Sequence, residues 1–187
     1  MDVEFSAFPK TFSGNVAVFV AADKRLLATA QAFDLDVGGA TVRAMDASRF
    51  TGAKAQILTL LGQSSDLTRL TLLGVGKGRD LDARTAEGLG GLVAADANAA
   101  GQKAVTVVVE PVKGSRLAPG QIAAHIAIGA RLRNYRFGKY KTKDKPEQKP
   151  SLEKITIVLA GPAEARRAYG QLEPTIDAVF FTRDLVS

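Results

Sequence analysis

The sequence predicts an α/β domain in which a mixed sheet of about six strands carries helices on both faces. Segments with strand patterns alternate with segments of helical periodicity along the 187 residues. One of the strand segments, residues 103–109, is an apolar run rich in valine, as expected of a strand covered on both faces. With 46% hydrophobic and 24% charged residues, the chain has the composition of a globular domain with a filled core.

The amino-terminal part predicts two strands and two helices. Residues 3–8 alternate apolar and polar side chains, as in a half-buried strand, and residues 15–20 form an apolar run, as in a buried strand. Asp23 is expected to cap a helix over residues 24–33. Two adjacent glycines then break the chain before a weaker helix, which is expected to run to about Phe50.

The middle of the chain predicts a hairpin followed by a long helix. Residues 56–61 and 69–75 have strand patterns and are separated by a short polar loop, which favours an antiparallel pair. Asp82 is expected to cap a helix that runs to Ala97, and Gly101 is suited to end it.

The last third predicts two further helices, a strand and a terminal helix. Pro119 is expected to begin a helix, and residues 154–160 to form a buried strand. A short helix is expected around residues 164–169, with Pro174 in the first turn of a separate final helix. That helix reaches Ser187 without a glycine stop, so we interpret the chain as an excised domain of a longer protein.

The positive charge is concentrated in the segment that follows the Pro119 helix. The formal net charge is +6, and the basic residues are interleaved with Tyr135, Phe137 and Tyr140. The basic candidates for binding are Arg131, Arg133, Arg136, Lys139, Lys141 and Lys143. One interpretation is a solvated loop, and the other is a surface for nucleic acid or an acidic partner.

The residues themselves indicate no active site. There is no cysteine, and the one histidine, His125, has no recognisable nucleophile nearby, so a packed or interface role is favoured. No two carboxylates stand at a spacing typical of acid/base or two-metal chemistry. The glycines from Gly74 to Gly78 match neither a P-loop nor a dinucleotide fingerprint; a tight turn is favoured over phosphate binding. The apolar run 16–22 is too short to span a membrane, and a cytoplasmic location is expected.

Three motifs in order resemble the amino-terminal domain of leucyl aminopeptidases, the M17 metallopeptidase family. The first is the glycine-lysine turn around residues 74–81, which is similar to Gly-Leu-Gly-Lys-x-x-x-Leu of the family. The second joins Gly129-Ala130-Arg131-Leu132 to the Tyr-x-Phe-x-x-Tyr-Lys-Thr-Lys pattern at 135–143. The third is the closing Thr-Arg-Asp-Leu-Val-Ser at 182–187. The resemblance covers nearly the whole chain.

This resemblance implies a macro-like domain over residues 1–172 and, over 173–187, the start of a helix leading to an absent catalytic domain. In the family, that second domain holds two divalent metals, zinc or manganese, and cleaves amino acids from the amino end of peptides. The present domain would serve homo-hexamer assembly and active-site access, and would itself be inactive. The family's Asn-Thr-Asp-x-Glu-Gly-Arg-Leu signature is absent, so no catalytic or metal residue is assigned here.

Two alternatives remain open from the sequence. A nucleic-acid-binding module would use the basic aromatic segment 131–149, and this activity is compatible with the aminopeptidase domain. ADP-ribose or nucleotide binding at Gly74 to Gly78 ranks last, because a fold does not by itself imply a function.

Overall fold

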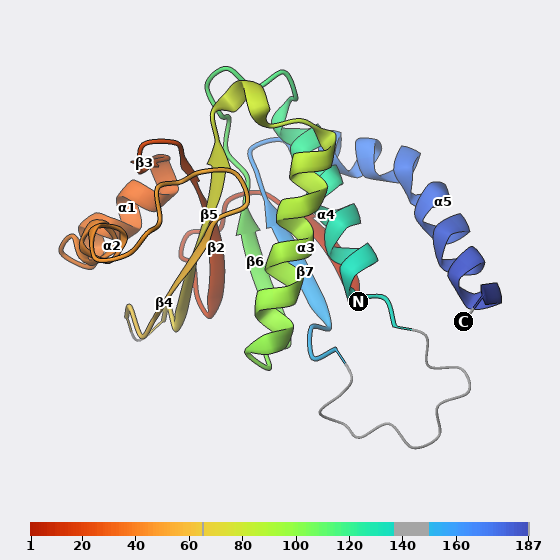
Figure 1. The fold of residues 1–187 in the computed structure, drawn as a ribbon, viewed down its shortest axis with the longest axis horizontal. Helices are drawn as coiled ribbons and strands as arrows, with labels where there is room; N and C mark the ends of the chain where they lie inside the picture. The colour runs from red at the N-terminus through yellow and green to blue at the C-terminus, as the bar shows by residue number, and fades with distance from the viewer. Residues whose placement is uncertain (65, 137–149, 187) are drawn as a thin grey trace.

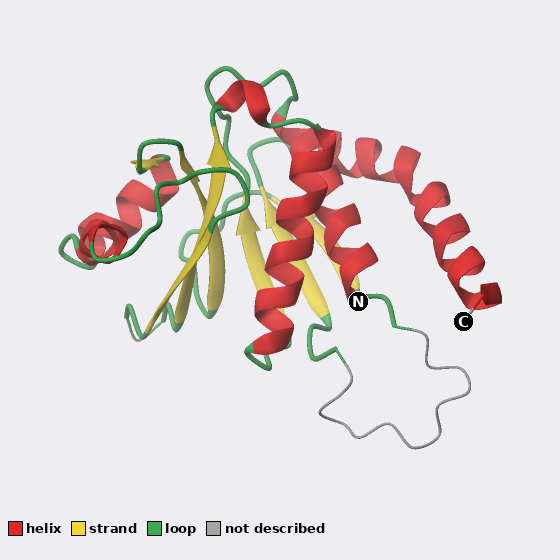
Figure 2. Ribbon diagram, viewed as in Figure 1, coloured by secondary structure: helices red, strands yellow, loops and turns green. Residues whose placement is uncertain are grey.

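A seven-stranded mixed sheet forms the middle layer of the fold, with helices on both of its faces (Figures 1 and 2). The computed structural model describes residues 1–64, 66–136 and 150–186. The strands are β1 (Asp2–Ser6), β2 (Asn15–Ala21), β3 (Arg25–Leu26), β4 (Ile57–Leu61), β5 (Arg69–Gly76), β6 (Ala104–Val108) and β7 (Lys154–Val158). The helices are α1 (Ala28–Asp36), α2 (Ala40–Asp46), α3 (Ala83–Ala99), α4 (Pro119–Asn134), α5 (Pro162–Val186) and the 3-10 turn η1 (Gly78–Asp80).

The sheet order is β1-β7-β6-β2-β5-β4, with β3 beside β2. The strands pair in parallel, except that β4 is antiparallel to β5 and β3 is antiparallel to β2. The α/β class, the mixed sheet and the helices on both faces are therefore confirmed. The expected hairpin is present, with Leu61 opposite Arg69. The seventh strand is β3, which has two residues.

Strand β2 divides the core into two halves because successive side chains of a strand point to opposite faces. All seven of its residues are buried. Phe19 belongs to the cluster formed with α3 and α4, whereas Val18 belongs to the cluster formed with α1 and α2. The sequence-based expectation of a buried strand over residues 15–20 is confirmed.

Helices α3 and α4 approach so closely that two glycines are required at their contact. A Cβ on Gly90 would stand 2.0 Å from the carbonyl oxygen of Ile126, and one on Gly129 would stand 1.8 Å from that of Glu87. Both distances are far below van der Waals contact, and the opposing atoms belong to rigid helical backbone. The two helices can therefore pack at this distance only with glycine at both positions.

The start of α1 differs from the sequence-based expectation. Asp23 and Lys24 have positive φ angles, 62° and 56°, and form a tight turn into β3 instead of a helix. The helix begins at Ala28, and Asp23 does not cap it. A distant carboxylate, that of Glu110, accepts the backbone N–H of Thr29 at 3.1 and 3.2 Å and takes the place of the local cap.

The end of the chain also differs from expectation. The short helix around residues 164–169 and the separate helix at Pro174 are one continuous helix, α5, with Pro174 inside it. A proline inside a helix lacks one backbone hydrogen bond, so proline favours a helix start. Contacts with α4 outweigh that local preference, because Arg131 of α4 bonds residues of α5 on both sides of Pro174.

Helix α3 begins and ends as the sequence predicts. Asp82 Oδ1 accepts the backbone N–H of Thr85 at 2.7 Å and its hydroxyl at 2.6 Å. These hydrogen bonds lower the pKa of Asp82 below its ordinary value of 3.8, because they stabilise the charged carboxylate. Gly101, with φ +65°, follows the helix in the left-handed conformation that favours glycine.

The close contact of α3 and α4 predicts opposite effects for two glycine-to-alanine substitutions. Gly129→Ala should lower the free energy of unfolding by about 1–3 kcal/mol, because the new methyl group overlaps the carbonyl of Glu87. Gly88→Ala should raise it by about 0.5–1 kcal/mol, because that helical position is open and alanine favours the helix. Urea denaturation measures both, and equal effects of the two substitutions would contradict the packing argument.

The Asp82 cap predicts a pH-dependent contribution to stability. Since the folded pKa lies below the unfolded one, the contribution is complete above the unfolded pKa and is lost as the pH falls through the folded pKa. Asp82→Ala should therefore melt below the wild type at about pH 7, and the difference should shrink as the pH falls through the folded pKa of Asp82. Asp80→Ala, in the adjacent turn, is the control. A difference in melting temperature that persists in acid would rule out the charged cap.

Candidate interaction surface between helices α4 and α5

Arg131, the first of the basic candidates, lies in the last turn of α4 and binds three side chains of α5. Its guanidinium nitrogens lie 2.6 Å from the Tyr169 hydroxyl, 3.0 Å from a Glu173 oxygen and 3.3 Å from an Asp177 oxygen. These partners are spaced four residues apart and so lie on one face of the helix. With its side chain only 20% exposed, Arg131 fixes α5 against α4.

The charge of Arg131 is maintained although its side chain is largely buried. Burial alone would lower the pKa of Arg131, but the hydrogen bond to Tyr169 and the charges of Asp177 and Glu173 outweigh it and raise the pKa. Burial raises the pKa of Tyr169, and the hydrogen bond and charge of Arg131 oppose part of that rise. The pair therefore stays a charged arginine and a neutral tyrosine at neutral pH.

Two aromatic rings extend this contact toward the end of α5. Tyr135 stacks on Phe180, with 4.7 Å between ring centroids and 16° between planes. Arg131 lies 5.5 Å from the Phe180 centroid, and Arg183 lies 5.5 Å from that of Tyr135. The four side chains form a row in which two cations enclose two stacked rings.

Two further hydrogen bonds close the carboxyl end of α4. The Tyr135 hydroxyl donates to Asp184, and this bond is the main reason that the pKa of Tyr135 is raised. Arg183 donates to the carbonyl oxygen of Leu132 at 3.2 Å, one of the carbonyls that a helix leaves without an internal partner. We call Arg131, Tyr135, Tyr169, Glu173, Asp177, Phe180, Arg183 and Asp184 the α4–α5 cluster.

The structure places the basic candidates in different surroundings. Arg131 is held inside the α4–α5 cluster, whereas Arg133 is exposed on the same helix. Arg136 is the last residue described before the gap. Lys139, Lys141 and Lys143 lie outside the described residues, so nucleic-acid binding by this segment stays a prediction.

The acidic partners of Arg131 could not be predicted from its neighbours along the chain. Glu173 and Asp177 follow Arg131 by 42 and 46 residues. The signal that could have found them is their spacing with Tyr169, which places one aromatic and two acidic side chains on one helical face. The three side chains share one helical face only because α5 continues across Pro174.

Backbone packing explains the glycines at the end of β5 and in the turn that follows it. A Cβ on Gly74 would stand 2.1 Å from the Ala53 oxygen, and one on Gly78 would stand 2.1 Å from the Lys113 oxygen. Gly76 has a φ of +71°, which favours glycine. All three glycines are thus required for the turn and its contacts, which supports the tight-turn interpretation.

His125 is a packed residue of the α3–α4 contact. Its Nδ1 lies 2.9 Å from an oxygen of Glu87, and its side chain is only 17% exposed.

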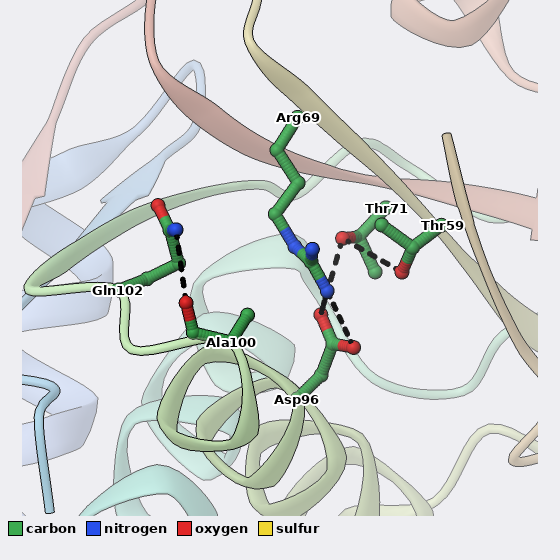
Figure 3. A network of polar contacts seen from close by, with 6 residues as sticks. All are labelled: Thr59, Arg69, Thr71, Asp96, Ala100 and Gln102. Atoms are coloured by element: carbon green, nitrogen blue, oxygen red, sulfur yellow. Dashed lines mark hydrogen bonds and ion pairs between the residues drawn. The ribbon is translucent and has the colours of Figure 1, made fainter. Parts of the chain in front are cut away.

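A second polar network joins α3 to the β4–β5 hairpin: Arg69 Nη2 lies 2.8 and 2.9 Å from the two oxygens of Asp96 (Figure 3). The hydroxyl of Thr71, a second residue of β5, lies 3.5 Å from Asp96 and 3.4 Å from the hydroxyl of Thr59 in β4, so both strands of the hairpin take part (Figure 3).

Among residues 1–64, 66–136 and 150–186, no group of three or more His, Asp or Glu side chains could hold a metal ion. In the same part of the chain, no helix is both long and apolar enough to cross a membrane.

Comparison with known proteins shows to which family the chain belongs. The family model described as the cytosol aminopeptidase family, N-terminal domain, matches residues 17–144. The chain belongs to the cytosol aminopeptidase family. It is 35% identical to the probable cytosol aminopeptidase of Caulobacter vibrioides over 100% of its own length and 37% of that protein. It is 30% identical to that of Rhizobium leguminosarum bv. trifolii, again over 100% of this chain and 37% of the relative.

Solved structures show the same fold for this domain. A mutant of tomato leucine aminopeptidase superposes with a TM-score of 0.79 at 20% identity, over 100% of this chain and 38% of the tomato chain. The bottromycin maturation enzyme BotP in complex with Mn gives a TM-score of 0.62 at 18% identity, over 92% of this chain and 31% of that chain. The chain thus spans about 37% of the curated relatives it matches in full.

The α4–α5 cluster predicts that Arg131 stabilises this cytosol aminopeptidase domain. Arg131→Ala should lower the free energy of unfolding by about 1–2 kcal/mol, because Glu173 and Asp177 lose a partly buried partner. Arg133→Ala removes the same charge from an exposed position of α4 and should change stability by less than about 0.5 kcal/mol. Urea denaturation compares them, and equal losses would show that net charge, not the cluster, matters.

Proposed function

We propose that this chain is the non-catalytic amino-terminal domain of a metal-dependent aminopeptidase that removes amino-terminal residues from peptides. The match to the N-terminal domain model of the cytosol aminopeptidase family is the observation that carries the proposal. The relatives are named aminopeptidases, and the chain spans 37% of their length. The activity is assigned to the part of the protein beyond this domain, since the family's Asn-Thr-Asp-x-Glu-Gly-Arg-Leu signature is not in this sequence.

Within that protein, the domain would serve oligomer assembly and access to the active site. The α4–α5 cluster supports such a role, because it holds α5 in a fixed direction relative to the sheet. Phe181 and Leu185, one helical turn apart on α5, are 65% and 69% exposed. Apolar side chains left in water at this spacing are suited to packing against another surface, and we assign that surface to the catalytic part.

The remaining properties of the whole protein follow from the same family assignment. We expect two divalent metal ions, zinc or manganese, in the catalytic part, with peptides as substrates. We also expect a homo-hexamer in the cytoplasm. We expect the metal ligands to lie in the catalytic part; among the residues that the structure describes, no group of three or more His, Asp or Glu side chains could hold a metal ion.

The test compares the 187-residue chain with a longer protein in which the catalytic part of a relative, such as the Caulobacter vibrioides protein, follows Ser187. With manganese or zinc added, the longer protein should hydrolyse leucine amide and the 187-residue chain should not. The chelated longer protein is the control for metal dependence. Metal-dependent turnover by the 187-residue chain, purified to homogeneity, would overturn the proposal.

A further inference from the structure

A groove lies on the opposite side of the sheet from the α4–α5 cluster, between α1, the segment 8–12 and the β4–β5 loop. Its volume is about 620 Å³. Small-molecule sites in proteins fall at roughly 300–1,000 Å³, so the groove has the size of such a site. The aminopeptidase assignment leaves this region without a function.

One wall of the groove is aromatic. Phe12 packs edge-on against Phe33, with 5.4 Å between ring centroids, and edge-on against Phe8 at 6.5 Å. Phe8 keeps 44% of its surface exposed at this position. A flat apolar group entering the groove would therefore find ring edges and faces to pack against, and would remove the Phe8 ring from water.

A buried carboxylate lies in the same groove. Glu110 is only 8% exposed, and both of its oxygens accept a single N–H, that of Thr29. Within the described part of the chain, Glu110 has no other hydrogen-bond donor and no lysine, arginine or histidine as an ion-pair partner. A carboxylate can accept about four hydrogen bonds, so capping α1 uses only part of its capacity. The partial positive charge at the amino end of α1 stabilises this carboxylate in part, and a bound cation would supply the full counter-charge that it lacks among the described residues.

The charge of the groove is opposite to that of the chain as a whole. Asp36, Asp66 and Glu110 line it, against Lys10 as the one basic residue among its described lining residues. Three negative charges and one positive charge give a local charge of −2, whereas the chain carries +6. This arrangement favours cations over anions inside the groove.

We propose that this groove binds a small molecule that joins a protonated amine to an apolar body. The amine donates hydrogen bonds to the unoccupied lone pairs of Glu110, and the apolar body packs along Phe8, Phe12 and Phe33. Both halves of the ligand are specified by separate observations: the buried carboxylate with one donor, and the aromatic wall of a groove with ligand-sized volume.

Three probes with the same phenyl ring test the proposal on the 187-residue chain. They are 2-phenylethylamine, 2-phenylethanol and 3-phenylpropionate, which carry a positive, a neutral and a negative head group. Amide chemical shifts are followed by nuclear magnetic resonance during each titration. The amine should give saturable shifts at Thr29, Phe33 and Glu110 and should bind about tenfold tighter than the alcohol, with the propionate weakest.

Substitutions separate the charge from the shape of the groove. Glu110→Gln keeps an oxygen for the Thr29 N–H but removes the charge, so the amine should bind no tighter than the alcohol. Ala32→Trp, at an exposed position of α1 that lines the groove, should fill it and abolish binding of all three probes. Glu153→Gln removes an exposed carboxylate, one that lies outside the groove and pairs with Lys103, and should leave every affinity unchanged.

The proposal is overturned if the amine gives no saturable shifts at groove residues, or if the propionate binds as tightly as the amine. It is also overturned if folded Glu110→Gln keeps the preference for the amine. If circular dichroism shows that Glu110→Gln has lost its helices, Ala32→Trp decides: unchanged amine binding then rejects the groove as the site. These outcomes do not depend on peptidase activity, so they are independent of the test of the proposed function.

Discussion

The contact between α3 and α4 fixes the positions of the other helices on one side of the sheet. Gly90 and Gly129 allow the two backbones to meet where any side chain would overlap a carbonyl group. Helix α3 is joined to the sheet by the Arg69–Asp96 pair, and α4 is therefore held at a fixed distance from the sheet as well. Helix α5 then packs on α4 through Arg131, so its direction depends on the glycine contact that α4 makes with α3 on its other side.

The α4–α5 cluster shows why a basic residue need not be part of a binding surface. Arg131 comes first in a strongly basic segment, yet its charge is balanced by Glu173 and Asp177 and shielded by Phe180. The energetic role of its guanidinium is to join two helices, and the hydrogen bonds and the aromatic row make that contact directional. In this domain, the contact sets the direction of the helix that carries the exposed Phe181 and Leu185.

Glu110 both caps helix α1 and lines the groove, which lies on the face of the sheet opposite α3 and α4. Its carboxylate lies against the amino end of α1, where the exposed N–H groups of a helix favour a negative charge. A local cap from Asp23 would have satisfied α1 without a buried carboxylate. Because the chain instead turns into β3 at that point, the cap comes from beyond β6, and a charged group is brought into an aromatic groove.

The sequence by itself determined the α/β class, the buried strand β2, the β4–β5 hairpin, and the Asp82 and Gly101 ends of α3. Each of these depends on periodicity or on residues a few positions apart, such as Asp82 and Thr85, so local patterns suffice. The order of the motifs also indicated the family, although no pattern located a functional site. Only the tertiary structure decided the Glu110 cap, 81 residues from Thr29, the continuity of α5 across Pro174, and the acidic partners of Arg131. These features depend on contacts between segments distant in the chain, whose free energies outweigh local preferences for a cap or a helix start.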